Sequence, residues 1–153
     1  MRVPLFLADN RVAFETLYHA PAYTAQRRAR YLHVPGRQLV KSVLLRAPAG
    51  YLVAVLPADA CVDLAALGQT LGGPVRLASA EEIPEVFRDC EWGALSPFGS
   101  LYGLATVLDE GLDPAVMIVF EGHSHAEAIR MHCRDFERLE RPRRLRFARR
   151  PHP

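Results

Sequence analysis

The sequence predicts a single α/β domain of the α+β type, built on a mixed or antiparallel sheet. The chain has 153 residues, half of them hydrophobic, so it is long enough to bury one substantial core. Short apolar runs and helical segments follow one another without the strict strand–helix alternation of a parallel sheet. No apolar run approaches the ~20 residues that a membrane-spanning helix needs, so we expect no membrane partner.

End signals and helical periodicity predict five helices. Thr24, Asp63 and Ser79 are suitable N-caps, and Glu82, three residues after Ser79, completes a capping box. Glycines and prolines at 35–36 and 72–74 end two of the segments. The expected helices cover residues 1–13, 24–32, 64–71, 79–87 and 133–139.

Period-two alternation and short apolar runs predict the strands. The clearest pair flanks Pro48-Ala49-Gly50, which is a hairpin signal between two runs rich in valine and leucine. The expected strands cover residues 14–18, 39–47, 51–56, 75–77, 104–108, 115–121 and about 126–131.

Lys41 is the most informative single residue of the chain. It is the one lysine among 19 basic residues, the others being arginines. Such a composition indicates a coding bias that has replaced most lysines by arginine. A lysine is retained under this bias where a planar guanidinium cannot substitute for a compact ammonium. Lys41 also lies inside the apolar run 39–45, where a charged side chain must be paired or functional. The alternative is an ordinary lysine whose stem covers apolar neighbours.

A second candidate site is the segment Gly93-Ala94-Leu95-Ser96-Pro97-Phe98-Gly99. Its bracketing glycines allow the loop to present backbone N–H groups to a carbonyl or phosphate oxygen. The spacing differs from that of the G-x-S-x-G nucleophile elbow and from that of a P-loop. We therefore expect Ser96 to be a secondary contact and not a nucleophile. A plain tight turn is the alternative, because glycine and proline are common in turns.

Histidines form the third candidate group. His123 and His125 share one face if the preceding strand continues through them. No third ligand has suitable spacing, so we expect these residues and His19 to be polar pocket or surface residues, and we expect no metal. The three cysteines are widely spaced and odd in number, which argues against a disulfide framework and favours a reducing cytoplasm.

Charge is distributed unevenly along the chain. Residues 138–150 hold seven arginines and one glutamate, a net charge of +6, whereas the rest of the chain carries −4. We expect residues 1–140 to form the domain and residues 141–153 to form an Arg-rich tail that binds RNA phosphates in a salt-dependent manner. The alternatives are a frayed terminus and a segment anchored on the domain by Leu145 and Phe147.

Several segments, in their order along the chain, resemble one known family. They are Tyr18-His19-x-Pro21-Ala22, Val34-Pro35-Gly36-x(4)-Lys41-Ser42-Val43, Leu77-Ala78-Ser79-x-Glu81-Glu82 and Gly93-x-x-Ser96-Pro97-Phe98-Gly99. The specific part is the strand lysine followed about 50 residues later by the Gly-x-x-Ser-Pro loop. On these motifs, residues 14–139 resemble the YbaK/ProX family of aminoacyl-tRNA deacylases, which includes the editing domain inserted in bacterial prolyl-tRNA synthetases.

The resemblance implies a compact domain with a mixed, barrel-like sheet flanked by helices. It implies hydrolysis of the ester that joins a mischarged amino acid to the tRNA 3′ end, with Lys41 near the terminal ribose and phosphate. It puts the loop from Gly93 to Gly99 beside the aminoacyl pocket and makes Gly122, His125 and His19 candidate substrate-binding residues. Many members carry basic residues after the glycine, where this chain has His123-Ser124-His125. No cofactor is implied.

Two other functions stay open at this stage. One is a non-catalytic module of the same fold that binds tRNA or a synthetase, and the other is a hydrolase of small esters. The expected partners are the 3′ end of an aminoacyl-tRNA and, as a second candidate, an aminoacyl-tRNA synthetase, with no DNA partner. A requirement for Lys41 separates an enzyme from a binding module, and salt-dependent affinity separates a tRNA binder from a small-ester hydrolase.

Overall fold

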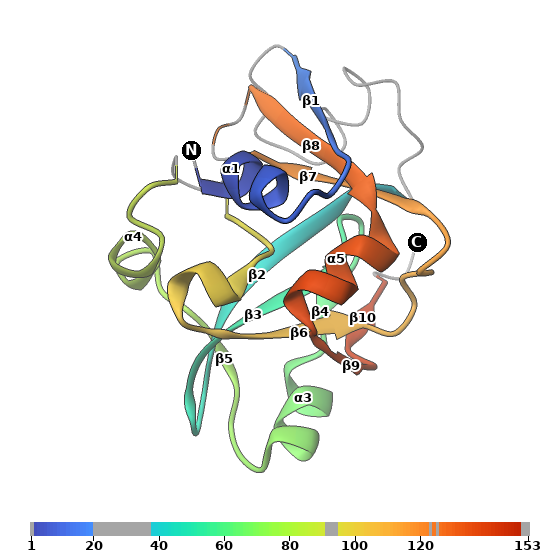
Figure 1. The fold of residues 1–153 in the computed structure, drawn as a ribbon. Coiled ribbons are helices and arrows are strands. Elements are labelled where there is room, and N and C mark those ends of the chain that lie inside the picture. The colour runs from blue at the N-terminus through green and yellow to red at the C-terminus, as the bar shows by residue number, and fades with distance from the viewer. Residues whose placement is uncertain (1, 20–37, 91–94, 123, 125, 151–153) are drawn as a thin grey trace.

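A five-stranded sheet with the strand order β5-β2-β3-β6-β9 is the largest element (Figure 1). The structure is a computed structural model that describes residues 2–19, 38–90, 95–122, 124 and 126–150. At the centre of the sheet, β2 (Val40–Ala47) and β3 (Gly50–Pro57) form the expected antiparallel hairpin. The other strands are β5 (Arg76–Leu77), antiparallel to β2, and β6 (Ala105–Asp109) and β9 (Arg143–Leu145), in parallel register beyond β3.

A second, antiparallel sheet has the order β1-β8-β7. It contains β1 (Glu15–Tyr18), β7 (Met117–Glu121) and β8 (Glu127–His132), and a parallel bridge between Leu39 and Val119 connects it to the start of β2. A short pair joins β4 (Cys61–Val62) to β10 (Ala148–Arg149). The mixed α/β architecture is therefore confirmed, although the described strands do not close into a barrel.

The helices confirm two of the predicted capping residues, Asp63 and Ser79. The Asp63 carboxylate accepts a hydrogen bond from the Ala66 N–H at 3.0 Å, which starts α3 (Leu64–Leu71). Ser79 and Glu82 form both bonds of the capping box before α4 (Glu82–Val86). The remaining helices are α1 (Arg2–Asp9), α5 (Cys133–Glu140) and the 3₁₀ turn η2 (Gly99–Tyr102). The helix expected at 24–32 lies outside the described residues.

Two apolar clusters cover the two faces of the β2–β3 hairpin. Side chains alternate along each strand, so Val40, Leu44 and Val53 enter a central cluster with α1, α5 and the second sheet. Leu45 and Leu56 enter a second cluster on the opposite face, under α3. None of the helices in the described ranges has the length and hydropathy required to cross a membrane. Both faces of the hairpin are thus buried, which explains its almost continuous apolar sequence.

The Arg-rich segment is part of this fold, which corrects the expected boundary at residue 140. β9 adds an edge strand beside β6, and the Phe147 side chain is 1% exposed within the second cluster. The buried Asp109 carboxylate accepts bonds from the Phe147 N–H at 3.0 Å and the Ala148 N–H at 2.8 Å. The expected anchoring of the segment through Leu145 and Phe147 is therefore confirmed.

We expect Phe147→Ala to lower the free energy of unfolding by about 3–5 kcal/mol, because it removes a fully buried aromatic ring and leaves a cavity. Urea denaturation followed by circular dichroism measures this change. Leu5→Ala, at a side chain that is 64% exposed, is the control and should change stability by no more than about 0.5 kcal/mol. Equal, small effects of the two substitutions would contradict an anchored C-terminal segment.

Candidate functional site

Lys41 is partly buried at the start of β2, where it pairs with Leu56 of β3. Its neighbours Val40 and Leu44 belong to the central cluster, whereas Val43 and Leu45 belong to the second cluster. Period-two alternation therefore puts the Lys41 side chain on the face opposite Val40, beside its cross-strand partner Leu56, which belongs to the second cluster. A partly buried lysine beside an apolar cluster can keep its stem packed and its ammonium accessible.

The same end of β2 lies against the turn between β7 and β8. The bridge between Leu39 and Val119 fixes the two strands side by side in parallel. Lys41 follows Leu39 by two residues, and Glu121 follows Val119 by two residues. Because side chains alternate along a strand, Lys41 lies on the same face as Leu39, and Glu121 lies on the same face as Val119. Glu121 is 9% exposed, and the Gly122 N–H donates to the Glu127 carbonyl at 3.1 Å to close the turn.

His19 joins this group from a third strand. β1 pairs with β8 up to Tyr18 opposite Glu127, and the next residue donates its backbone N–H to the Ala126 carbonyl at 3.0 Å. The structure therefore brings two predicted site residues, His19 and Gly122, to one turn, and this turn adjoins the strand end that carries Lys41. His125, the third residue predicted on that side, lies outside the described residues, as does His123.

The described half of the predicted loop is anchored in the central cluster. Leu95 and Phe98 are buried there, and the Phe98 ring makes edge contacts with the rings of Phe6, Phe120 and Phe136 at centroid distances of 5.4, 6.0 and 5.0 Å. The Phe98 side chain is 0% exposed and therefore anchors the loop. Since this side chain cannot reach a ligand, Phe98 can contact one only through its backbone. Gly93 and Ala94 lie outside the described residues.

Ser96 has an internal partner. Its hydroxyl oxygen accepts a hydrogen bond from the Phe98 N–H at 3.1 Å, and its side chain is only 3% exposed. The Phe98 N–H is thus already used within the loop, and Pro97 has no N–H to offer a ligand.

Glu140, which sequence reasoning missed, holds the other side of the loop. Its carboxylate accepts bonds from the Ser100 N–H at 3.0 Å, the Ser100 hydroxyl at 2.6 Å and the Thr106 hydroxyl at 2.5 Å. A Cβ added at Gly99 would approach the Thr106 hydroxyl to 2.5 Å, so the turn has no room for a side chain there. The sequence feature that could have identified Glu140 is that it is the one acidic residue of residues 138–150, which also hold seven arginines.

Titratable groups beside the loop are held in their neutral forms. Burial raises the pKa of the Cys90 thiol, and burial together with a 2.6 Å bond to Asp89 raises the pKa of Tyr102 well above its ordinary value. Burial also raises the pKa of Cys133 to about 11. A thiolate nucleophile is therefore disfavoured at both of these cysteines at neutral pH. No group of three or more metal-ligating His, Cys, Asp or Glu side chains occurs within the described ranges.

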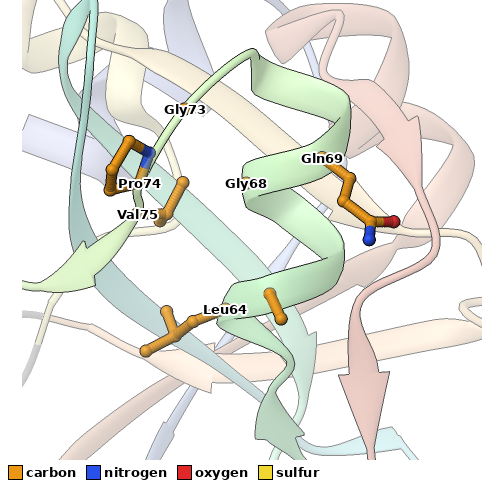
Figure 2. Close-up of a pocket in the computed structure, with 7 residues that line it drawn as sticks. Leu64, Gly68, Gln69, Gly73, Pro74 and Val75 are labelled. Atoms are coloured by element: carbon orange, nitrogen blue, oxygen red, sulfur yellow. The ribbon is translucent and has the colours of Figure 1, made fainter.

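One apolar pocket lies far from Lys41, at the other end of β2. It has a volume of about 390 Å³ between α3 and the following turn, and it is lined by Leu64, Ala65, Gly68, Gln69, Gly73, Pro74 and Val75 (Figure 2). A Cβ on Gly73 would meet Pro48 at 2.6 Å, so this turn packs against the hairpin tip, at the opposite end of β2. The pocket has few polar groups to orient a reactive substrate, and we assign it no role in the chemistry.

The chain belongs to the aminoacyl-tRNA editing domain family, whose model matches residues 19–139. That range includes the Lys41 strand, the 93–99 loop and the β7–β8 turn. Over 87 residues the chain is 33% identical to a proline–tRNA ligase of Thermosipho africanus, a match that covers 56% of this chain and 15% of the ligase. The chain thus corresponds to a small part of that relative's length.

Solved structures share the fold. The crystal structure of a hypothetical protein superposes with a TM-score of 0.88 at 20% identity, covering 97% of this chain and 99% of the other. The crystal structure of a candidate trans-editing enzyme for prolyl-tRNA synthetase superposes with a TM-score of 0.79 at 22% identity, covering 88% of this chain and 86% of the other. At these identities the likeness establishes the architecture alone.

We expect Ser96→Ala to lower the free energy of unfolding by about 1–3 kcal/mol, because the buried Phe98 N–H loses its acceptor. Ser42→Ala is a matched control on β2, since the buried Ser42 hydroxyl has no hydrogen-bond partner. Removing an unsatisfied hydroxyl should leave stability unchanged or raise it. Chemical denaturation of both variants measures the difference, and a Ser96→Ala variant as stable as Ser42→Ala would contradict a structural role for Ser96.

Proposed function

We propose that this chain hydrolyses the ester bond of a mischarged aminoacyl-tRNA. The observation that carries the proposal is the family match over residues 19–139, which spans every predicted site segment. The lone lysine of the chain, partly buried on β2, supports it, because an ammonium there can meet an anionic ligand. The similarity to a prolyl-tRNA synthetase relative and to a candidate trans-editing enzyme points to the same reaction class.

The proposed chemistry needs positioning and positive charge more than a strong nucleophile. An aminoacyl ester is already activated, so a water molecule or a ribose hydroxyl held close to the carbonyl is sufficient. Negative charge develops on the carbonyl oxygen as the tetrahedral intermediate forms, and donors fixed in advance stabilise it. We assign Lys41 to the terminal ribose and phosphate or to this oxyanion, and the loop backbone to the aminoacyl group.

The bonding within the loop argues against a covalent serine mechanism. The Ser96 hydroxyl is buried and already accepts the Phe98 N–H, and no described histidine is hydrogen bonded to it. A serine nucleophile requires an adjacent base that removes its proton. We therefore assign Ser96 to shaping the loop. The amino acid that is removed is a small one on this proposal, because a single methylene discriminates by only about 1–3 kcal/mol and small amino acids escape synthetase selection.

We expect Lys41→Ala to reduce deacylation by roughly two to three orders of magnitude, the usual effect of losing one oxyanion donor. Lys41→Arg should restore little, because a planar guanidinium does not replace a compact ammonium. The assay measures release of labelled amino acid from a panel of mischarged tRNAs under single-turnover conditions. Hydrolysis of none of these tRNAs by the wild-type protein would contradict the proposal and leave the binding module as the alternative.

Arg46→Ala is the matched control for the lysine variants. Arg46 is exposed at the other end of the same strand, where its guanidinium lies 4.7 Å from the centre of the Tyr51 ring. Its removal deletes one positive charge from β2 without touching the proposed site, so deacylation should stay within about twofold of wild type. A loss as large as that of Lys41→Ala would indicate a general charge effect.

A further inference from the structure

The C-terminal arginines divide into two groups according to their contacts. Arg138, Arg144 and Arg150 are paired with Asp135, Glu137 and Asp59, respectively. Arg144 also donates to the carbonyls of Glu110 at 3.1 Å and Leu112 at 2.7 Å, so it ties β9 to α5 and to the loop after β6. These three guanidinium groups serve the fold.

The other four are Arg141, Arg143, Arg146 and Arg149. All four are exposed, and none of their side chains forms a hydrogen bond or an ion pair with another residue of the described ranges. They occur within nine consecutive residues, on a segment that runs along the edge of the five-stranded sheet and then turns to pair with β4. We call Arg143, Arg146 and Arg149 the edge arginines.

The backbone beneath the edge arginines is fixed. β9 is paired with β6 over Val107 to Asp109, Phe147 is buried, and Asp109 binds two successive backbone N–H groups. α5, β9 and β10 lie together at one side of the molecule (Figure 1). The charges are therefore presented by an ordered scaffold, and little backbone entropy is lost when they meet a ligand.

We propose that the edge arginines form a docking surface for the phosphate backbone of the tRNA, apart from the site that receives its 3′ end. Charge complementarity carries the argument: residues 138–150 carry +6, whereas the rest of the chain carries −4 and repels RNA. The choice of tRNA as the RNA rests on the proposed function. Arginine is suited to phosphate because its planar fork donates two parallel hydrogen bonds.

Protection of an exposed sheet edge is the competing explanation. Charged side chains on an edge strand prevent pairing with another chain, and β9 is such a strand. A docking surface requires RNA affinity to depend on the edge arginines, whereas edge protection does not.

The test replaces all three edge arginines, as Arg143→Gln, Arg146→Gln and Arg149→Gln in one variant. Binding of uncharged tRNA is measured by fluorescence anisotropy at salt concentrations from 50 to 200 mM. If each edge arginine neutralises one phosphate, the slope of log affinity against log salt should flatten by about 2 to 3, at ~0.7–0.9 per contact. Affinity at the lowest salt should fall at least about tenfold.

The matched control replaces Arg11, Arg46 and Arg88 by glutamine, which makes the same change in net charge at exposed sites on other elements. An equal loss of affinity in the control would overturn the proposal, because net charge alone would then explain it. Unchanged affinity and slope in the edge variant would also overturn it, and self-association of that variant would then favour edge protection. If the triple variant does not fold, the single Arg146→Glu replaces it and should weaken binding at low salt.

Failure of this inference and failure of the proposed function are distinguishable. Uncharged tRNA contains no ester, so its binding is measured independently of hydrolysis. Edge-dependent binding without hydrolysis of any mischarged tRNA would support the docking surface and reject the enzyme. The opposite outcome has two parts: the wild-type protein hydrolyses a mischarged tRNA, and the edge variant binds tRNA with the same salt dependence as the wild type. That outcome would support the enzyme and reject the docking surface.

Discussion

The β2–β3 hairpin is apolar on both faces, and the other elements of the fold are arranged to bury both of them. An apolar strand pair with only one covered face would expose the other to water, at about 25 cal/mol per Å² of apolar surface. The second sheet, α1 and α5 cover one face, and α3 and the C-terminal segment cover the other. Near the start of β2, Lys41 and Ser42 are only partly buried, and Lys41 is the charged residue there. Burial of both faces therefore builds the core and restricts where on the hairpin a charged group can lie.

Two buried carboxylates connect this scaffold to its functional segments. Asp109, at the end of β6, binds the backbone of the C-terminal segment, and Glu140, at the end of α5, binds the turn that follows the predicted loop. Each carboxylate satisfies donors that would otherwise be buried without partners. Each is also far in sequence from the groups it holds, so one side chain fixes the position of a segment that local propensity does not define. The edge arginines and the 95–99 loop both depend on such a contact.

The sequence predicted the parts of the fold that local chemistry determines. The hairpin, the Asp63 cap and the Ser79–Glu82 capping box are confirmed, because each depends on residues within a few positions of one another. The strands of the C-terminal segment were not predicted from the sequence. Their many arginines leave no clear alternation of apolar and polar residues, and the strands they pair with, β6 and β4, are distant in sequence. The first helix ends at Asp9, four residues before the expected position, where the chain reverses at Arg11 with a positive φ of 56°.

The sequence named candidate residues for the site, and their roles stay predictions, whereas their arrangement could be seen only in the structure. Lys41 stood out by composition, and its partial burial agrees with its place in an apolar strand. Strand alternation puts its side chain on the face of β2 opposite the cluster that holds Leu95 and Phe98, and no local pattern in the sequence predicts this relation between the lysine and the loop. The proximity of Lys41 to the Gly122 turn depends on a single bridge between the two sheets, which no local pattern reveals.

The proposed contact between Lys41 and the acceptor end of the substrate can be measured directly, because the chain has a single lysine. Protein labelled with [13C]lysine gives one lysine side-chain signal, which can be followed by NMR while a non-hydrolysable 3′-aminoacylamino-adenosine is added. We expect that signal to shift and to saturate with the same midpoint as binding measured by calorimetry. Saturating binding with an unmoved lysine signal would contradict the proposed contact.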